Sequence, residues 1–326
     1  MITHFRIQNF RSFLDAEVDL QPFSLVVGAN GSGKSNLLKF FALVGGKKIN
    51  GAGVDLTAWK KHQQNDLGAA SGLIDIDTIP MWSISFRDDQ DAKILNAPDW
   101  FGYDLPIYNI DPNKVSQVET TIPAAKVASD GSGTAQVLDA LKNGDREDLF
   151  DKIEESFRRY VPEVEKLSLR TVQDGKKQIQ VREKGLGAPL PATELSEGTR
   201  LILCILTILH QENPPPVILL EDIDRGLHPR LFEYVAPLMR DIAVRNKINI
   251  IATSHNPYLV DCFQDHKEAV IIVEKKDGAS TLTTLAKQLE GLDYETVDPE
   301  DMPLGSLWYS GLIGGTPKKI SAEARH

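Results

Sequence analysis

The sequence predicts an α/β fold on a mixed sheet, with a large insertion after the first helix. Three buried strands alternate with helices in the C-terminal third, at PVILL, INIIAT and EAVIIVEK. A further apolar strand, FSLVVG, runs into a glycine-rich turn at residues 28–33, and a helix follows over 34–44. Because strands that alternate with helices form parallel sheets, the turn and the three C-terminal strands are expected to share one sheet.

The other elements follow from apolar periodicity. Short strands are predicted at residues 2–10 and 17–27, and an irregular, partly β insertion at 46–135, with strand-like segments MWSISF and LPIYNI. Residues 134–160 read as helical, KLSLRTV and KQIQVRE form a hairpin around Asp174-Gly175, and a helix spans 196–210. After PVILL we expect a helix over 230–245 and a short one after Pro257.

Composition excludes several classes of protein. Hydrophobic residues are 41% and charged residues 25% of the 326, as in an ordinary globular protein. The formal net charge of −10 argues against a uniformly basic nucleic-acid coater but leaves a local basic groove open. No signal peptide is recognisable, and the longest apolar run, LILCILTIL, is far shorter than the roughly 20 residues that cross a bilayer. Cys204 and Cys262 read as buried free thiols. We therefore expect a cytoplasmic protein without a membrane partner.

The strongest motif is GANGSGKS, from Gly28 to Ser35, which fits the phosphate-loop pattern G-x-x-x-x-G-K-[ST] at every fixed position. The flanks also fit, with a buried strand before it and a helix after it. Glycines let backbone N–H groups converge on phosphates, and the positive helix N-terminus adds to the attraction. Lys34 is predicted to reach the β- and γ-phosphates, and the Ser35 hydroxyl to bind magnesium.

A second motif, VILLEDIDRGLHP, begins at Val217 as a buried strand and ends in adjacent acids, Glu221 and Asp222. Ligand sites of α/β sheets lie at the carboxyl ends of strands, so Glu221 is expected to hold magnesium. Because successive strand residues point to opposite faces, Asp222 is expected to face differently and to address the water that attacks the γ-phosphate. The alternative interpretation is a solvated acidic turn.

Two further motifs complete the set. In ELSEGTR, Ser196 and Gly198 precede an apolar helix, so Ser196 can cap that helix and present its N-terminus to an anion. In IIATSHNPYLVD, a buried strand ends at Thr253, and Ser254 and His255 follow where they can reach the same crevice. Taken alone, the first is a plain helix cap and the second a structural histidine.

These four motifs in this order resemble the ABC-type ATPases. The resemblance is strongest to the SMC/RecF-like branch and to its stand-alone relatives, the AAA_21-type predicted ATPases that include the ATPase half of OLD-family nucleases. It covers residues 1–45 and about 150–315, and FRIQNFRSF, VPEVEKLSLR and GSLWYSGLIGG resemble further family segments. The resemblance implies an ABC-ATPase head over residues 1–326, a single domain with an N-terminal antiparallel β part. Its expected parts are residues 1–45 (strands and phosphate loop), 46–135 (insertion), 136–210 (helical and hairpin signature lobe) and 211–326 (acidic strand, switch histidine and C-terminal part).

The resemblance also implies a mechanism. Two such domains sandwich two ATP molecules head to tail, so Ser196 and Gly198 would act in trans, and Asp224 to His228 would lie at the interface. Asp222 and His255 would be catalytic, and Ser35 and Glu221 would bind Mg²⁺. A Q-loop glutamine is expected between residues 46 and 100, with Gln63 and Gln64 as candidates. The residues expected to bind ATP are Arg11, Asn30, Gly31, Ser32, Gly33, Lys34, Ser35 and Asn36.

Three features depart from the family pattern. The acid pair is Glu-Asp instead of Asp-Glu, and the signature has Glu197 where transporters usually carry glycine. The insertion between Lys34 and Ser196 is too short, and too poor in heptads, for SMC arms. The segment after His255 is too short for the Toprim nuclease of OLD proteins, so we expect any effector to be a separate chain. Since Asp is one methylene shorter than Glu, we also expect slow turnover.

The sequence therefore predicts an ATPase switch whose ATP-driven homodimer, or higher homo-oligomer, controls a separately encoded effector in bacterial anti-phage defence or genome maintenance. One alternative is a DNA-binding repair ATPase, with basic residues on one face of the dimer. Another is a nucleotide-gated scaffold with little hydrolysis. A transporter subunit is disfavoured by the signature. The candidate DNA-binding residues are Lys47, Lys48, Lys60, Lys61, Arg158 and Arg159.

Overall fold

The helices and strands of the chain form two units, and each unit has its own core. The computed structural model describes residues 1–45, 71–76, 79–87, 90–95, 104–122, 125–292 and 302–316. The first unit consists of residues 1–105, 216–224 and 239–326, and the second of residues 106–215 and 225–238. The two units are described separately below. No helix of the described ranges is long and apolar enough to span a membrane.

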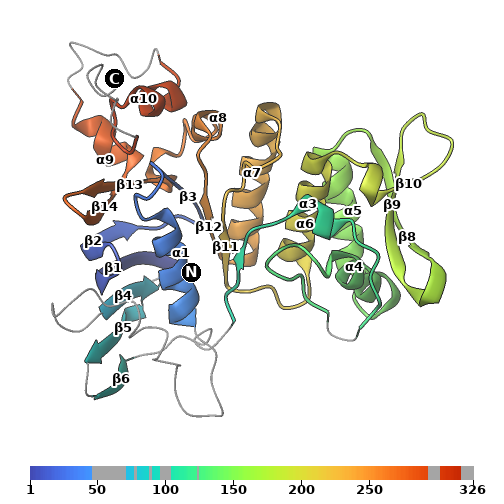
Figure 1. Ribbon diagram of the computed structural model, residues 1–326, viewed down its shortest axis with the longest axis horizontal. Coiled ribbons are helices and arrows are strands. Elements are labelled where there is room, and N and C mark those ends of the chain that lie inside the picture. Colours follow the sequence, from blue (N-terminus) through green and yellow to red (C-terminus); the bar gives the residue numbers. More distant parts are fainter. Residues whose placement is uncertain are drawn as a thin grey trace, which may run out of the picture. The chain divides into compact units, whose positions relative to one another are not determined.

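The core of the first unit is a mostly parallel sheet (Figure 1). Strands β14 (Ala279–Thr284), β13 (Val270–Lys276), β3 (Phe23–Gly28), β12 (Asn249–Thr253) and β11 (Val217–Leu220) lie in this order. The four strands from β13 to β11 pair in parallel, as the sequence predicts, whereas β14 is antiparallel to β13. The polar sequence ASTLTT gives no strand signal, and β14 was not predicted.

An antiparallel sheet forms the other β layer of the first unit. Its strands lie in the order β2 (Phe13–Asp19), β1 (Ile2–Phe10), β4 (Ser71–Ile76), β5 (Ile79–Arg87) and β6 (Gln90–Leu95). Strand β5 contains the predicted segment MWSISF. The predicted start of the second strand at residue 17 is wrong, because a tight turn at Arg11, in left-handed conformation with φ of 52°, lets β2 begin at Phe13.

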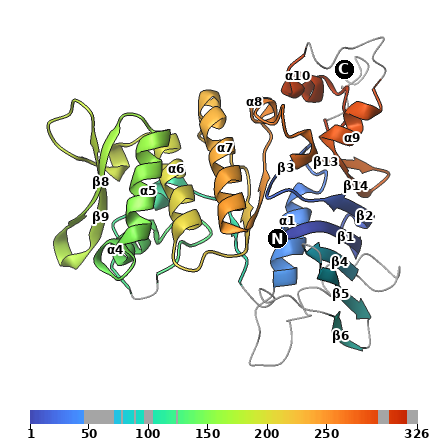
Figure 2. The same cartoon turned by 180° about the vertical axis from the view of Figure 1, so that it is seen from behind.

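Helix α1 (Lys34–Gly45) packs on β3, β12 and β11 and also contacts the antiparallel sheet through aromatic rings (Figure 2). The rings of Phe5 and Phe41 meet edge to face with centroids 4.9 Å apart, and those of Phe10 and Phe40 with centroids 5.8 Å apart. Such contacts add to the burial of large apolar area. Helix α1 therefore contacts both sheets of the first unit. The other helical segments of this unit are α8 (Pro257–Asp261), η3 (Lys267–Ala269), α9 (Leu285–Glu290) and α10 (Leu304–Ser310).

The second unit combines helices with a small sheet. Helices α4 (Thr134–Asn143) and α5 (Glu147–Tyr160) pack on strands β8 (Val164–Thr171) and β9 (Lys177–Glu183), which are antiparallel. The predicted hairpin is confirmed, with Asp174 left-handed at φ of 61° in its turn. The remaining elements are β7 (Ile107–Tyr108), α3 (Pro112–Val115), η1 (Gln173–Gly175), β10 (Leu190–Pro191), η2 (Ala192–Glu194) and α6 (Glu197–His210). Helix α7 (Pro229–Asn246) begins in this unit and ends in the first.

Several predictions concern residues that the structure does not describe. The Q-loop candidates Gln63 and Gln64 lie outside the described residues, as do Lys47, Lys48, Lys60 and Lys61. Of the predicted segment LPIYNI, only Ile107 and Tyr108 are a strand. The two cysteines are free thiols, but Cys262 is only partly buried, which corrects the prediction for that residue.

Candidate functional site: a phosphate loop and an acid turn

The phosphate loop, Gly28 to Ser35, joins the buried strand β3 to helix α1. Gly33 has φ of 123°, and a Cβ there would lie 2.7 Å from the Ser280 hydroxyl, so both conformation and space require glycine. At Gly28 a Cβ would lie 2.3 Å from the carbonyl oxygen of Val273. The loop is therefore shaped by glycines at the two points where neighbouring chain comes closest.

Segments from the C-terminal part of the chain support the loop from behind. Ser280 on β14 donates a hydrogen bond from its hydroxyl to the Ser32 carbonyl, at 2.5 Å, and its N–H to the Ser12 carbonyl. The Gly315 N–H donates to Glu274 Oε1 at 2.7 Å, which holds the Gly314-Gly315 turn against Gly28. None of these contacts is contained in the phosphate-loop motif.

Lys34 is buried, at 6% exposure, and its Nζ donates to the carbonyl oxygens of Gly28 and Ala29 at 2.8 and 2.9 Å. Burial lowers the pKa of Lys34 from 10.5 to about 8, because desolvation disfavours the charged form. The nearby carboxylates of Asp222, Asp224 and Glu221 partly oppose this shift. The ammonium group of Lys34 is therefore poorly hydrated. An anion that enters the site would pair with this cation.

Ser35 and Glu221 meet beside the loop, although they are 186 residues apart in the sequence. The Ser35 hydroxyl donates to Glu221 Oε1 at 2.5 Å. A hydroxyl and a carboxylate are hard oxygen ligands of the kind that Mg²⁺ prefers, usually with substrate phosphates and water in the other positions. No group of three or more His, Cys, Asp or Glu that could hold a metal occurs among the described residues. The pair thus fits a magnesium ion shared with a phosphate ligand.

The neighbouring Asp222 corrects one step of the sequence argument. Strand β11 ends at Leu220, so Glu221 and Asp222 lie in a turn and the alternation of strand side chains does not apply. Asp222 has a left-handed backbone, with φ of 52°. Its N–H donates to the Thr253 hydroxyl at 2.9 Å, and that hydroxyl lies 3.4 Å from Asp222 Oδ1. The direction of Asp222 follows from this turn and from Thr253, not from a strand.

His255 follows β12 and is exposed, with Nε2 3.8 Å from Asp222 Oδ1. Its neighbour Ser254 is fully buried, and the Ser254 hydroxyl accepts the N–H of Asn256, so only the histidine reaches the crevice. One cavity of about 190 Å³ brings loop, turn and histidine together. Its lining residues are Asn30, Gly31, Gly33, Lys34, Ser35, Asn36, Asp222, Thr253 and His255.

Two predicted ATP-binding residues do not line this cavity. Ser32 is buried at 2% exposure and faces the chain behind the loop. Arg11 donates to Asn36 Oδ1 at 3.0 Å, and Asn36 Nδ2 donates to the Ser12 hydroxyl, so Arg11 lies next to a lining residue. Thr253 is the lining residue that the sequence analysis did not single out, because a threonine at the end of a buried strand has no motif of its own.

The signature residues belong to the second unit. Ser196 caps α6 as predicted, since its hydroxyl accepts the Thr199 N–H at 3.1 Å, and it is exposed. Glu197 lies against Gly226, because a Cβ added at Gly226 would come 3.1 Å from Glu197 Oε2. Gly198 is buried, and a Cβ there would come 3.3 Å from the Gly226 carbonyl oxygen. The departure at Glu197 is therefore accommodated by a glycine with φ of 77° at residue 226.

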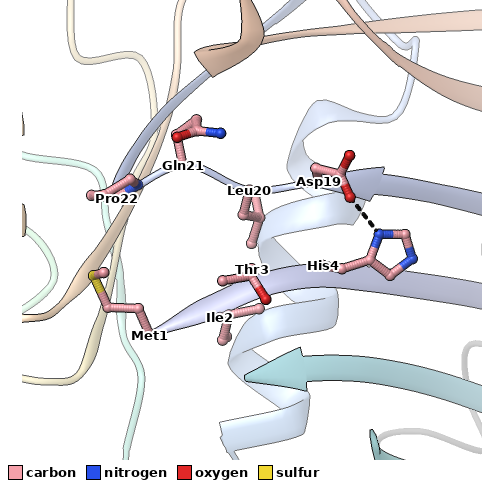
Figure 3. Close-up of a pocket in the computed structure, with 8 residues that line it drawn as sticks. All are labelled: Met1, Ile2, Thr3, His4, Asp19, Leu20, Gln21 and Pro22. Carbon is pink, nitrogen blue, oxygen red and sulfur yellow. Dashed lines mark hydrogen bonds and ion pairs between the residues drawn. The ribbon is translucent and has the colours of Figure 1, made fainter. Parts of the chain in front are cut away.

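A larger cavity of about 520 Å³ lies elsewhere in the first unit (Figure 3). It is lined by Met1 to His4 and by Asp19 to Pro22, and an ion pair between His4 and Asp19 borders it. The cavity contains no residue of the phosphate loop or of the acid turn. Size alone therefore does not identify the functional site, which is the smaller, polar cavity at Lys34.

Comparisons with known proteins agree with this geometry. Residues 1–95 match a family model described as "AAA ATPase domain", and residues 129–261 match AAA_21, described as "AAA domain, putative AbiEii toxin, Type IV TA system". The first range contains the phosphate loop, and the second contains the signature, the acid turn and His255. No curated protein matches the chain.

Solved SMC head domains share the fold. An SMC head bound to the C-winged helix domain of ScpA has a TM-score of 0.58 at 16% identity and covers 89% of this chain and 99% of its own. The SMC head with an extended coiled coil from Pyrococcus furiosus, bound to the C-terminal domain of ScpA, has a TM-score of 0.56 at 15% identity over 89% and 98% of the two chains. The Thermotoga maritima SMC head has a TM-score of 0.51 at 16% identity over 87% and 98%.

The chain therefore contains AAA-type ATPase domains and has the fold of an SMC head. The cavity at Lys34 is its candidate ATP site. The identification confirms the predicted fold class, with its mostly parallel central sheet and antiparallel N-terminal strands. The predicted relation to OLD-family nucleases stays a prediction, as do the individual roles of the site residues.

Proposed function

We propose that this ABC/SMC-like ATPase is a switch in which ATP joins two copies head to tail and the dimer controls a separately encoded effector. The observation that carries the proposal is the cavity at Lys34, which groups a phosphate loop, a candidate metal pair and two candidate catalytic side chains. These are the parts that phosphoryl transfer needs, since its catalysis consists mainly of positioning and charge stabilisation.

In the proposed reaction, Lys34 and the N–H groups of the loop bind the β- and γ-phosphates. Ser35 and Glu221 hold Mg²⁺, which when bound neutralises charge on the phosphate oxygens. Asp222 orients the attacking water and accepts its proton, and His255 contacts the γ-phosphate. Asp222 is one methylene shorter than the usual glutamate, so we propose slow turnover and a long-lived ATP-bound state. A basal rate of tens per second, which is ordinary for enzymes, would contradict this.

The size of the cavity supports a dimer. Pockets for small molecules usually measure about 300–1,000 Å³, and the cavity of about 190 Å³ is smaller than this range. We propose that a partner copy adds a second surface to the bound nucleotide. The exposed Ser196 at the N-terminus of α6 is our candidate for that surface, because helix N-termini attract anions.

The dimer is tested by measuring molecular mass in solution with and without a slowly hydrolysed ATP analogue. The wild-type mass is expected to double with the analogue. Ser196→Arg is expected to bind the analogue with nearly normal affinity, stay monomeric and lose turnover. Arg158→Ser, on the exposed face of α5, is the control variant. An unchanged ATPase rate in Ser196→Arg would refute the head-to-tail arrangement.

A separately encoded effector is the less direct part of the proposal. The AAA_21 description names a toxin of a toxin–antitoxin system, which supports a role in defence or growth control in a bacterial cytoplasm. Genome maintenance is the other setting we consider. The test is to purify the protein together with the product of its neighbouring gene and to ask whether ATP changes the complex. A mixture that stays unassociated with and without ATP would count against this effector.

DNA binding is a second candidate function, and one observation favours it. On the β8–β9 hairpin, Lys166 pairs in register with Arg182, and both are exposed, as is Arg170 nearby. Like charges directly opposite each other destabilise a hairpin, so an anionic partner would compensate for them. Helices α4 and α5 contact β8 and β9 (Figure 2). We term Lys166, Arg170 and Arg182 the hairpin cations.

A gel shift with duplex DNA over a range of salt concentrations tests this function. Contacts to phosphates give a steep loss of affinity with salt, and each contact removed lowers the slope by about one. Lys166→Glu with Arg182→Glu should abolish binding if the hairpin cations are responsible. Arg158→Glu with Arg159→Glu tests the residues on α5 that the sequence suggested. Absence of a shift at low salt would exclude this function.

A further inference from the structure

We propose that Thr253 is a positioning residue for hydrolysis, and that the turn it holds selects aspartate over glutamate at residue 222. The proposal rests on the assignment of Asp222 as the base in the proposed function, and it concerns how that carboxylate is aimed. Thr253 ends β12, is 1% exposed and lines the cavity at Lys34.

Thr253 contacts the acid turn through both its hydroxyl and its backbone. The hydroxyl accepts the Asp222 N–H at 2.9 Å and can donate to Asp222 Oδ1, 3.4 Å away. The carbonyl oxygen of Thr253 accepts the Ile223 N–H at 3.1 Å. One buried residue thus satisfies two consecutive N–H groups of the turn and stands beside the carboxylate. The single hydroxyl proton is free to point at the carboxylate because the Asp222 N–H supplies the other hydrogen bond.

Thr253 also connects the turn to the phosphate loop. Within the central sheet, its neighbour Ala252 pairs with Leu220 at the end of β11, and Thr253 itself pairs with Val26, two residues before Gly28. The strand that fixes the hydroxyl is therefore in register with both strands that lead into the site. Because β12 also precedes His255, its end places both the hydroxyl and the histidine near Asp222 Oδ1, at 3.4 and 3.8 Å.

The left-handed backbone accounts for the reversed order of the two acids. Non-glycine residues rarely adopt φ near 52°, and Asp and Asn do so more readily because a short polar side chain can hydrogen-bond locally. At Asp222 the hydrogen-bonding partner is Thr253 Oγ1, at the end of the neighbouring strand β12. One more methylene would carry a glutamate carboxylate past this hydroxyl. The shorter acid is therefore the one that fits the turn.

This geometry and a simple reach argument make opposite predictions for Asp222→Glu. If reach alone limits the rate, the longer acid should approach the attacking water and raise turnover. If the turn and Thr253 aim the base, Asp222→Glu should lower turnover by roughly tenfold, since small misplacements of a catalytic group cost that much or more. ATP affinity should change by less than twofold, because Lys34 and the loop are unaffected.

The experiment measures single-turnover hydrolysis and ATP affinity separately in Thr253→Val, Thr253→Ser, Asp222→Glu and Asp222→Asn. Thr253→Val removes the hydroxyl at nearly constant volume and is expected to lower the hydrolysis rate about ten- to a hundredfold with affinity within twofold of wild type. Thr253→Ser keeps the hydroxyl and is expected to restore the rate to within about threefold. Thr284→Val is the matched control, because Thr284 is also a buried threonine at the end of a strand and accepts a backbone N–H, from Lys287.

The outcomes separate this inference from the proposed function. A normal rate in Asp222→Asn removes Asp222 from the role of base, and the proposed mechanism fails with it. An inactive Asp222→Asn together with a normal rate in Thr253→Val leaves that mechanism intact and overturns the positioning role. Turnover above wild type in Asp222→Glu overturns the selection of aspartate. If Thr253→Val does not fold, Thr253→Ser and Asp222→Glu decide the matter, since both keep a hydroxyl and a carboxylate in place.

Discussion

The phosphate loop and the acid turn border the same cavity, but the contacts that shape them differ in range. Within the loop, Lys34 bonds to carbonyls only five and six residues away, and Gly33 supplies the left-handed conformation itself. In the acid turn, Glu221 meets a partner 186 residues away and Asp222 one 31 residues away. The conformation of the loop therefore depends in part on its own sequence, whereas that of the turn depends on the folded sheet.

If the loop binds ATP and the turn acts in hydrolysis, substitutions in the two regions should affect different steps. The largest expected effect is the loss of ATP affinity in a variant of the loop. Lys34→Ala should weaken ATP binding at least about a hundredfold, because it removes the one lysine or arginine among the described residues that line the cavity. Titration calorimetry with ATP and magnesium measures this. Lys39→Ala, an exposed lysine on the same helix, should bind normally. Normal affinity in Lys34→Ala would end the phosphate-loop assignment.

The next effect tests the turn. Asp222→Asn should keep ATP affinity within about threefold while the hydrolysis rate falls roughly a hundredfold, as expected for loss of a general base. Rapid quenching after mixing with labelled ATP gives the rate, and filter binding gives the affinity. Asp241→Asn, on the surface of α7, is the control. Equal losses of affinity and rate would show that loop and turn are not separable.

ATP affinity should fall about tenfold between pH 7 and 9. Lys34 has a pKa of about 8 without nucleotide, so it is charged at pH 7 and mostly neutral at pH 9, and the phosphates bind the charged form. The contribution of Lys34 to folding stability changes with pH in the opposite direction. Between pH 8 and 10.5 the unfolded chain holds more protons at this residue, so its contribution to stability rises with pH. Lys34→Arg, which stays charged, should lose the pH dependence of binding, and a persistent tenfold change in that variant would assign it to another group.

The smallest expected effect tests the contacts between the loop and segments far away in the sequence. Glu274→Ala removes the acceptor of the Gly315 N–H, and one hydrogen bond contributes about 1 kcal/mol. ATP affinity should fall two- to fivefold, with the neighbouring exposed Lys275→Ala as control. A loss as large as that of Lys34→Ala would mean that the loop, too, depends mainly on distant contacts.

The same division explains how far the sequence could predict the structure. The glycine turn between β3 and α1, the Ser196 cap and the parallel strands follow local patterns of glycine, hydroxyl and apolar residues, and the structure shows all three. The direction of Asp222 was inferred from strand alternation, and that inference is wrong because β11 ends at Leu220. Thr253 was passed over because its importance comes from a partner on another strand.

Supporting contacts behind the loop were also beyond prediction. Ser280 belongs to β14, whose sequence is too polar to suggest a strand, yet its hydroxyl bonds to the Ser32 carbonyl. Glu274 lies near the end of the last predicted strand, and Gly315 lies far beyond it. A pattern in a single sequence does not predict which of its many acidic residues and glycines will contact each other in the folded chain.

The contact of the Gly314-Gly315 turn with Gly28 has a consequence for biosynthesis. The ribosome makes the phosphate loop long before it makes β13, β14 and this turn. The loop cannot be fully supported until these later segments have left the exit tunnel. Nascent chains stalled before Val270 should therefore not be retained on immobilised ATP, so the newborn protein gains its ligand only after these segments have emerged.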